Sequence, residues 1–129
     1  MKLEKTNLED CFILSPKMFE DERGTFSETF NAQNFLDQTG IAVTFVQDNQ
    51  STSKYGVVRG LHFQTGAHGQ AKLVRVVKGS ALYVVVDLRK GSPSFGKSFS
   101  IVLSGENKKQ LFVPRGFAHG FSVLEDDTV

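Results

Sequence analysis

The chain has 129 residues, of which 40% are hydrophobic and 22% are charged, and its formal net charge is +1. This length suits one domain with a buried core, and this composition is typical of a globular protein rather than a disordered or fibrous one. Because the Lys and Arg residues are scattered and balanced by Asp and Glu, the sequence predicts no nucleic-acid partner.

The sequence predicts neither a membrane span nor a secretory signal. The apolar runs are a few residues long, where a spanning helix needs about 20, and the first residues lack the apolar stretch of a signal peptide. Cys11 is the one cysteine, so no internal disulfide can form. We therefore expect a cytoplasmic protein in a reducing environment.

The first half of the chain alternates polar and apolar residues with a period of two. This pattern predicts strands over Thr25–Phe30, Val43–Asp48 and Val57–Gln64. Asn31–Gln38 is the one helical candidate, with Asn31 as a possible N-cap and Gly40 as a stop signal. We expect this helix to be short and peripheral.

The second half is also rich in strand patterns. Ala71–Lys78 and Ala81–Arg89 flank Gly79–Ser80, and a glycine at the first central position is what a type II′ hairpin turn requires. The sequence therefore predicts that these two strands form a hairpin. Further strands are predicted over Ser98–Leu103 and Gln110–Val113, and from His119 towards Leu124.

Many short strands separated by Gly-rich turns predict one all-β domain, an antiparallel sandwich or barrel. A small barrel can hold one ligand in its mouth. Polar residues at inward-facing strand positions are therefore the candidates for a functional site.

His62 is the first such candidate. Strand alternation places His62 and Gln64 on one face and Leu61 on the other. If Gly60 marks a bulge, Arg59 joins His62 on the same face. From the residues alone, a surface or structural histidine is an equally simple interpretation.

His119 and Lys72 are the next two candidates. His119 follows a Pro-Arg-Gly turn and lies among aromatic residues, where an imidazole usually has a structural or catalytic partner. Alternation places Lys72 with Val74 and Val76, so its ammonium group either reaches water at the strand end or points into a cavity.

Two polar segments have the residue types of a nucleotide site. Arg23, Phe26 and Glu28 offer a guanidinium, an aromatic face and a carboxylate, which suit phosphate and base, although a solvated charged turn is the usual explanation of such residues. Gln47–Asp48–Asn49 could read the edge of a planar ligand or cap a turn. No phosphate-binding glycine loop, zinc-type cysteine pair or activated serine motif is present.

Six segments in this order closely resemble the dTDP-4-dehydrorhamnose 3,5-epimerase family. The segments are Arg23–Glu28, Phe45–Asn49, Val58–Gln64, Gln70–Arg75, Val86–Pro93 and Pro114–Phe121. The resemblance implies a cupin-type jelly-roll barrel (a double-stranded β-helix) with a short peripheral helix. It also implies an isomerase of deoxysugar biosynthesis, such as that of rhamnose, acting as a homodimer without a metal or other cofactor.

The resemblance also implies roles for the candidate residues. The substrate is a dTDP-4-keto-6-deoxy sugar, whose ketone acidifies the protons on C3 and C5. His62 matches the catalytic base and Lys72 the catalytic residue beside the keto oxygen. The residues matching the substrate-binding positions are Arg59 and His119 at the sugar and phosphates, and Arg23, Phe26, Glu28, Gln47, Asp48 and Asn49 at the nucleotide.

Two departures from the family pattern affect these expectations. Tyr83 stands where the family usually has an acidic residue, although a phenol there can still form a hydrogen bond. The family also continues beyond Gly120–Phe121 with a tyrosine acid and an aspartate that pairs with the base. We therefore expect residues 1–129 to form a single epimerase domain that lacks this C-terminal segment and has impaired activity by itself.

Three other functions fit the same residues. The first is a 3-epimerase or a 3,4-ketoisomerase of similar fold, which acts on a related sugar nucleotide. The second is a metal-binding cupin that uses His62, His68 and His119, although Gln64 replaces the second histidine of the usual pair. The third is a nucleotide-sugar-binding module that has kept the fold without the chemistry.

Overall fold

A computed structural model describes residues 1–63 and 69–129, so Gln64 and His68 lie outside the described residues. The described part contains a short helix, α1 (Ala32–Thr39), and ten strands. The strands are β1 (Lys2–Lys5), β2 (Phe12–Ser15), β3 (Met18–Asp21), β4 (Gly24–Ser27), β5 (Val58–His62), β6 (Lys72–Arg75), β7 (Ser80–Asp87), β8 (Ser98–Ser104), β9 (Gln110–Val113) and β10 (Phe117–Val123).

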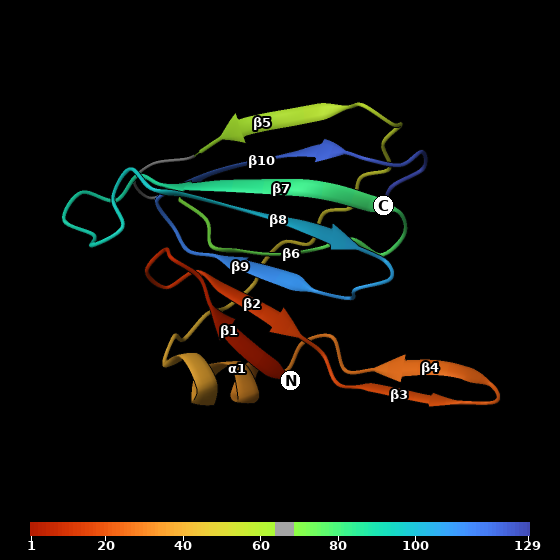
Figure 1. Cartoon of the computed structure of the whole chain (residues 1–129). Helices are drawn as coiled ribbons and strands as arrows, with labels where there is room; N and C mark the ends of the chain where they lie inside the picture. Colours follow the sequence, from red (N-terminus) through yellow and green to blue (C-terminus); the bar gives the residue numbers. More distant parts are fainter. Residues whose placement is uncertain (64–68) are drawn as a thin grey trace.

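Two antiparallel four-stranded sheets lie one above the other (Figure 1). The upper sheet has the order β5-β10-β7-β8, and the lower sheet has the order β1-β2-β9-β6. From β6 onward the chain passes repeatedly between the sheets, which is the connection pattern of a jelly roll. The predicted all-β class with one peripheral helix is confirmed.

The main core lies between the two sheets. Inward side chains of the lower sheet, such as Ile13 and Leu111, pack with Val85 and Leu103 of the upper sheet. Along each strand these positions alternate with outward ones, as the pleat of a sheet requires. The space between the sheets is therefore filled by apolar side chains where these residues meet.

Helix α1 covers the outer face of the lower sheet. Its Phe35 is fully buried against Phe112 of β9, with ring centroids 4.9 Å apart. The Asn31 side chain accepts a hydrogen bond from the Asn34 amide, and Gly40 ends the helix in the left-handed conformation. The predicted helix and both of its end signals are thus confirmed.

The predicted hairpin at Gly79–Ser80 is wrong. Strand β6 pairs with β9 in the lower sheet, whereas β7 pairs with β8 and β10 in the upper sheet. Gly79 does have a positive φ of 80°. A Cβ at this position would collide with Thr128. The glycine therefore also allows the chain at Thr128 to pack closely against residue 79.

The predicted strand over Val43–Asp48 is also wrong, because this segment has no strand pairing. Its apolar residues alternate because Ile41 and Val43 pack on the cluster around α1, and Phe45 packs on Phe30 with ring centroids 5.3 Å apart. The alternation of apolar residues therefore reflects the packing of one side of a loop, not the pairing of a strand in a sheet.

The predicted strand over Thr25–Phe30 is shorter than expected and is not half-buried. It ends at Ser27 as β4, pairs only with β3, and leaves Phe26 71% exposed. Sequence patterns also missed β1, β2 and β3, which are four residues each. Strands this short contain too few alternations to stand out from loops.

Within the described ranges, no helix is long and apolar enough to cross a membrane.

Candidate active site

The pairing of β5 with β10 brings two histidines together. His62 lies opposite His119, and Arg59 lies opposite Phe121. Two residues therefore separate this pair of positions on β5, whereas one residue separates them on β10. This extra residue is a β-bulge, and it places Arg59 and His62 on the same face. The sequence left a bulge at Gly60 open as a condition for Arg59 to join His62, and the register meets that condition.

The bulge depends on the absence of a side chain at Gly60. Its φ is 109°, a conformation that L-residues rarely adopt, and a Cβ there would lie 2.7 Å from the Gly120 Cα atom. The two backbones can therefore approach closely only with glycine at this crossing. The approach holds β5 in the register that sets His62 against His119.

The two imidazole rings lie at the edge of the upper sheet. Their centroids are 6.3 Å apart, and the ring planes meet at 57°. His62 is exposed, whereas His119 is half-buried. Among the described residues, no hydrogen bond reaches the His62 ring, so it is accessible as a proton acceptor.

Lys72 comes to this site from the lower sheet. It lies opposite Val113 on β9, and Val113 and its neighbour in alternation, Val74, belong to the core between the sheets. Lys72 therefore shares the inner face, as its alternation predicts. Its ammonium group donates to Gln70 Oε1 at 3.2 Å.

His119 is held by a tyrosine on the neighbouring strand. The Tyr83 hydroxyl lies 2.9 Å from His119 Nδ1, and Tyr83 itself is 4% exposed. Burial lowers the pKa of His119 to about 4, and the positive charges of Lys72 and protonated His62 contribute in the same direction. Burial also raises the pKa of Tyr83, so its hydroxyl stays protonated.

Arg59 has a polar partner on the segment before β5. Its guanidinium donates to the Ser53 hydroxyl, with Nη2 to Oγ at 3.2 Å. The contact is part-buried, and it ties the guanidinium group to the segment that precedes β5. The cation and the two histidines thus lie along one edge of the barrel.

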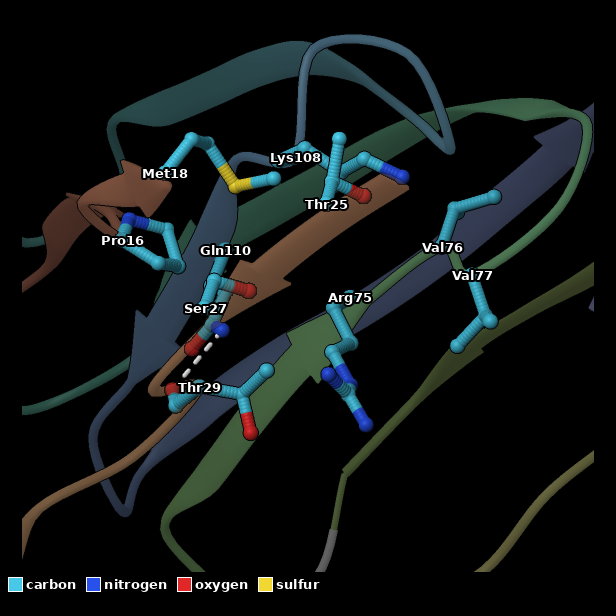
Figure 2. Close-up of a pocket in the computed structure, with 10 residues that line it drawn as sticks. All are labelled: Pro16, Met18, Thr25, Ser27, Thr29, Arg75, Val76, Val77, Lys108 and Gln110. Carbon is cyan, nitrogen blue, oxygen red and sulfur yellow. Dashed lines mark hydrogen bonds between the residues drawn. The ribbon is translucent and has the colours of Figure 1, made fainter. Parts of the chain in front are cut away.

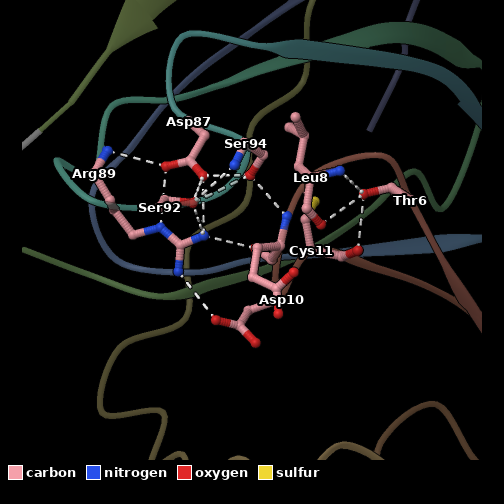
Figure 3. Close-up of polar contacts among 9 residues, drawn as sticks. Thr6, Leu8, Asp10, Cys11, Asp87, Arg89, Ser92 and Ser94 are labelled. Atoms are coloured by element: carbon pink, nitrogen blue, oxygen red, sulfur yellow. Dashed lines mark hydrogen bonds and ion pairs between the residues drawn. The ribbon is translucent and has the colours of Figure 1, made fainter.

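A buried carboxylate network supports the turn that leads into β10 (Figure 3). Asp87 accepts hydrogen bonds from Arg89 and from the hydroxyls of Ser92 and Ser94, both at 2.6 Å. Burial alone would raise the pKa of Asp87, but these hydrogen bonds outweigh it and hold the pKa well below its usual range.

Arg89 links this network to the strand that carries His119. Its guanidinium lies over the ring of Phe117, the first residue of β10, at 4.9 Å from the centroid. The Leu88 amide donates to the Gly116 carbonyl at 3.1 Å. The network therefore fixes where β10 begins. Sequence reasoning did not identify this role for Asp87 and Arg89.

The predicted nucleotide-binding residues lie elsewhere in the molecule. Arg23, Phe26 and Glu28 are on or just after the hairpin of β3 and β4, which projects from the lower sheet, away from β5 (Figure 1). Arg23 forms an exposed ion pair with Asp21 at 2.6 Å. Within one copy of the chain, the structure does not bring these residues to the histidines.

The second predicted nucleotide segment is an irregular stretch. Gln47, Asp48 and Asn49 are exposed, and Gln47 Nε2 donates to Asn49 Oδ1 at 3.1 Å. Their side chains are thus free to meet a ligand, but no strand fixes them.

A separate pocket of about 120 Å³ lies on the outer side of the lower sheet (Figure 2). Gln110 lies in it, donates from Nε2 to the Thr29 carbonyl at 2.9 Å, and leaves Oε1 without a hydrogen-bond partner in the described part of the chain. None of the predicted site residues lines this pocket. The histidine site is therefore distinct from it.

Residues 1–63 and 69–129 contain no group of three or more His, Cys, Asp or Glu placed to hold a metal ion. The alternative metal site needs His68 as a ligand, and His68 lies outside these ranges. That hypothesis is therefore not tested by the structure.

Comparisons with known proteins converge on one family. A sequence model described as dTDP-4-dehydrorhamnose 3,5-epimerase matches residues 5–129. The enzyme of that name from Shigella flexneri is 53% identical over 127 residues, which cover 98% of this chain and 70% of the relative. The one from Escherichia coli is 51% identical over 126 residues, covering 98% and 68%.

Solved structures agree with these sequence matches. The dTDP-4-dehydrorhamnose 3,5-epimerase from Elizabethkingia anophelis superposes with a TM-score of 0.96 at 55% identity, covering 99% of this chain and 70% of that one. The dTDP-6-deoxy-D-glucose-3,5-epimerase from Legionella pneumophila, solved in complex with dTDP-4-keto-L-rhamnose, has a TM-score of 0.93 at 46% identity. It covers 98% of this chain and 67% of that one.

Proposed function

The chain belongs to the dTDP-4-dehydrorhamnose 3,5-epimerase family, and we propose that it epimerises a dTDP-4-keto-6-deoxy sugar with His62 as the base. It is an isomerase acting on a nucleotide-linked sugar. The observation that carries the residue assignment is the register pair of His62 with His119, with Lys72 on the facing inner surface.

The chemistry requires a base, a positive group and a hydrogen-bond donor around one carbonyl group. The 4-ketone acidifies the protons on C3 and C5, and the negative charge of the enolate develops on its oxygen. Histidine is the side chain that most often serves as a general base in such proton transfers. In this proposal His62 takes the proton, and Lys72 stabilises the charge on the oxygen.

Arg59 suits the diphosphate of the substrate. A guanidinium can bind two phosphate oxygens at once, and Arg59 is held beside His62 by the bulge. Binding at this end of the barrel would place the sugar between the two sheets at the histidines. His119 would then meet the sugar from the side opposite Lys72.

The separation of the hairpin from the histidines favours a site built by two copies. If Arg23, Phe26 and Glu28 hold the nucleotide, the site they serve cannot be the one in their own copy, because the hairpin projects away from β5. We therefore propose a homodimer in which the hairpin reaches the partner's site. The exposed aromatic rings of Phe19 and Phe26 on this hairpin suit such a contact.

Return of the proton to the opposite face needs an acid. Of the two tyrosines in the chain, Tyr83 is engaged with His119, and Tyr55 is 69% exposed at the surface. Among the described residues, neither tyrosine hydroxyl is hydrogen-bonded to the His62 ring. We therefore assign the acid of the return step to neither of these two tyrosines.

The test is incubation of the chain with dTDP-4-keto-6-deoxyglucose in D₂O. Loss of the C3 and C5 proton signals by NMR at both carbons supports a 3,5-epimerase. Exchange at C3 alone would indicate a 3-epimerase, and a shift of the ketone to C3 would indicate a ketoisomerase. Binding of dTDP without any exchange would overturn the proposal in favour of a binding module.

A further inference from the structure

We propose that Tyr83 is a positioning residue that holds His119 as the neutral tautomer with its proton on Nε2, so that His119 serves the site as a hydrogen-bond donor. The use of that donor on the substrate rests on the proposed function. The tautomer itself is a property of the folded chain and is testable without substrate.

The first step of the argument is the contact between the two side chains. The Tyr83 hydroxyl lies 2.9 Å from His119 Nδ1, which is a good hydrogen-bond distance. The ring planes differ by 7°, and the centroids are 6.1 Å apart. The two rings are therefore nearly parallel, and their polar contact is made at Nδ1.

The second step decides whether Tyr83 or His119 donates the hydrogen bond. Tyr83 is 4% exposed, and within residues 1–63 and 69–129 its hydroxyl has no hydrogen-bond partner other than His119. If His119 donated from Nδ1, the phenol proton would be buried without an acceptor, which is costly. If Tyr83 donates, every proton in the contact is satisfied. The pair is therefore best satisfied with Tyr83 as donor and Nδ1 as acceptor.

The third step fixes the proton on the other nitrogen. A neutral imidazole that accepts at Nδ1 carries its hydrogen on Nε2. An imidazolium would place a second proton against the Tyr83 hydroxyl. Besides Tyr83 itself, the charged or titratable groups that face His119 are Lys72 from the lower sheet and His62 on the neighbouring strand, and a positive charge on either Lys72 or His62 opposes protonation of His119.

The consequence concerns the base. When His62 takes a proton it becomes a cation, with its ring 6.3 Å from that of His119. A neutral His119 adds no repulsion to this step, whereas an imidazolium would oppose it. At the same time the Nε2–H group can donate to a sugar oxygen. Tyr83 thus lets one histidine act as donor while its neighbour acts as base.

The direct test is ¹⁵N NMR of the histidine side chains in the ligand-free chain at neutral pH. We expect His119 to show an unprotonated Nδ1 and a protonated Nε2. In Tyr83→Phe, which keeps the ring and removes the hydroxyl, we expect a mixture of tautomers. Phe121→Leu is the matched packing control, because Phe121 also stacks on Tyr83, with ring centroids 5.9 Å apart, but offers no hydrogen bond.

The same variants are then compared in the D₂O exchange assay. We expect Tyr83→Phe to lower the rate constant for exchange by about tenfold, with a smaller effect on substrate affinity. A wild-type His119 protonated on Nδ1, or an unchanged tautomer in Tyr83→Phe, would overturn the inference. Correct tautomers with no exchange in the wild-type chain would instead contradict the proposed function, so the two failures are distinguishable.

Discussion

The backbones of Gly60 and Gly120 lie in close contact where β5 pairs with β10, and neither position has room for a side chain. A Cβ at Gly120 would lie 2.7 Å from the Arg59 carbonyl oxygen. This close approach allows the bulge that brings Arg59, His62 and His119 to one edge of the barrel. The candidate site therefore depends on two residues that take no part in its chemistry.

Gly60→Ala is expected to displace β5 and to reduce exchange activity sharply. Gly91→Ala is the matched control, because Gly91 has a similar positive φ of 82° but no atom within 4 Å of an added Cβ. In both variants the alanine must adopt a positive φ, which lowers the free energy of unfolding by about 1 kcal/mol. Overpacking adds about 1–3 kcal/mol at Gly60 alone. Equal unfolding free energies in a urea titration would contradict this account of the crossing.

Asp87→Asn is expected to lower the free energy of unfolding by about 3 kcal/mol, because it removes the charge that pairs with the part-buried Arg89 guanidinium. The pKa of Asp87 in the folded chain lies well below its ordinary 3.8, so the charge stabilises the fold fully above that value. The advantage of the wild type over the variant should be constant above about pH 5 and shrink as the pH falls further. Urea titrations at several pH values measure it; a constant difference down to pH 3 would argue against the network.

The burial of neutral His119 predicts a second pH effect of known sign. Its pKa falls from the model-peptide value of 6.5 to about 4 in the folded chain, so the unfolded chain binds more protons in this range. The contribution of neutral His119 to the free energy of unfolding is fully present above pH 6.5 and is lost as the pH falls towards 4. Between pH 7.5 and pH 5 we expect a loss of about 1 kcal/mol, allowing for solvent screening. His119→Asn should lack this component, and an identical pH slope in both proteins would show that His119 does not carry it.

The proposed dimer predicts complementation between two impaired variants, assayed at a substrate concentration below saturation. Arg23→Ala is expected to weaken dTDP binding by about tenfold without loss of stability, because its ion pair with Asp21 is exposed. His62→Asn removes the base. If each site combines the hairpin of one copy with the histidines of the other, mixed dimers contain one intact site.

The measurement is exchange activity after the two variants are unfolded and refolded together. Random pairing makes half of the dimers mixed, which would restore about a quarter of the wild-type activity. Each variant refolded alone is the control. If light scattering shows dimers but the mixture regains no exchange activity, Arg23 and His62 act in the same copy of the chain and the proposed shared site is wrong.

Sequence patterns located much of this site, because alternation and glycine chemistry are local properties. The parity of Lys72 follows from its neighbours in the chain and is confirmed, and the bulge that the sequence left open at Gly60 is present. The hairpin at Gly79 failed because a positive φ marks a turn but does not choose the partner strand. The bond between Tyr83 and His119 depends on the register of β7 and β10, which no local pattern specifies.

The resemblance to a known family supplied what local patterns could not. Alternation alone left Arg23 as part of a solvated turn, and in one copy of the chain that is how it lies, paired with Asp21. Its predicted role at the nucleotide requires a second copy. The distance between this hairpin and the histidines is a property of the whole fold, which composition and spacing do not reveal.

The central claim is that His62 removes the proton next to the ketone. The most direct measurement compares deuterium incorporation at C3 and C5 of dTDP-4-keto-6-deoxyglucose for the wild-type chain and for His62→Asn, with dTDP binding measured in both as a control for folding. We predict that the wild type incorporates deuterium and that the variant binds dTDP normally but loses incorporation by at least about a hundredfold. Incorporation by His62→Asn at the wild-type rate would contradict the assignment.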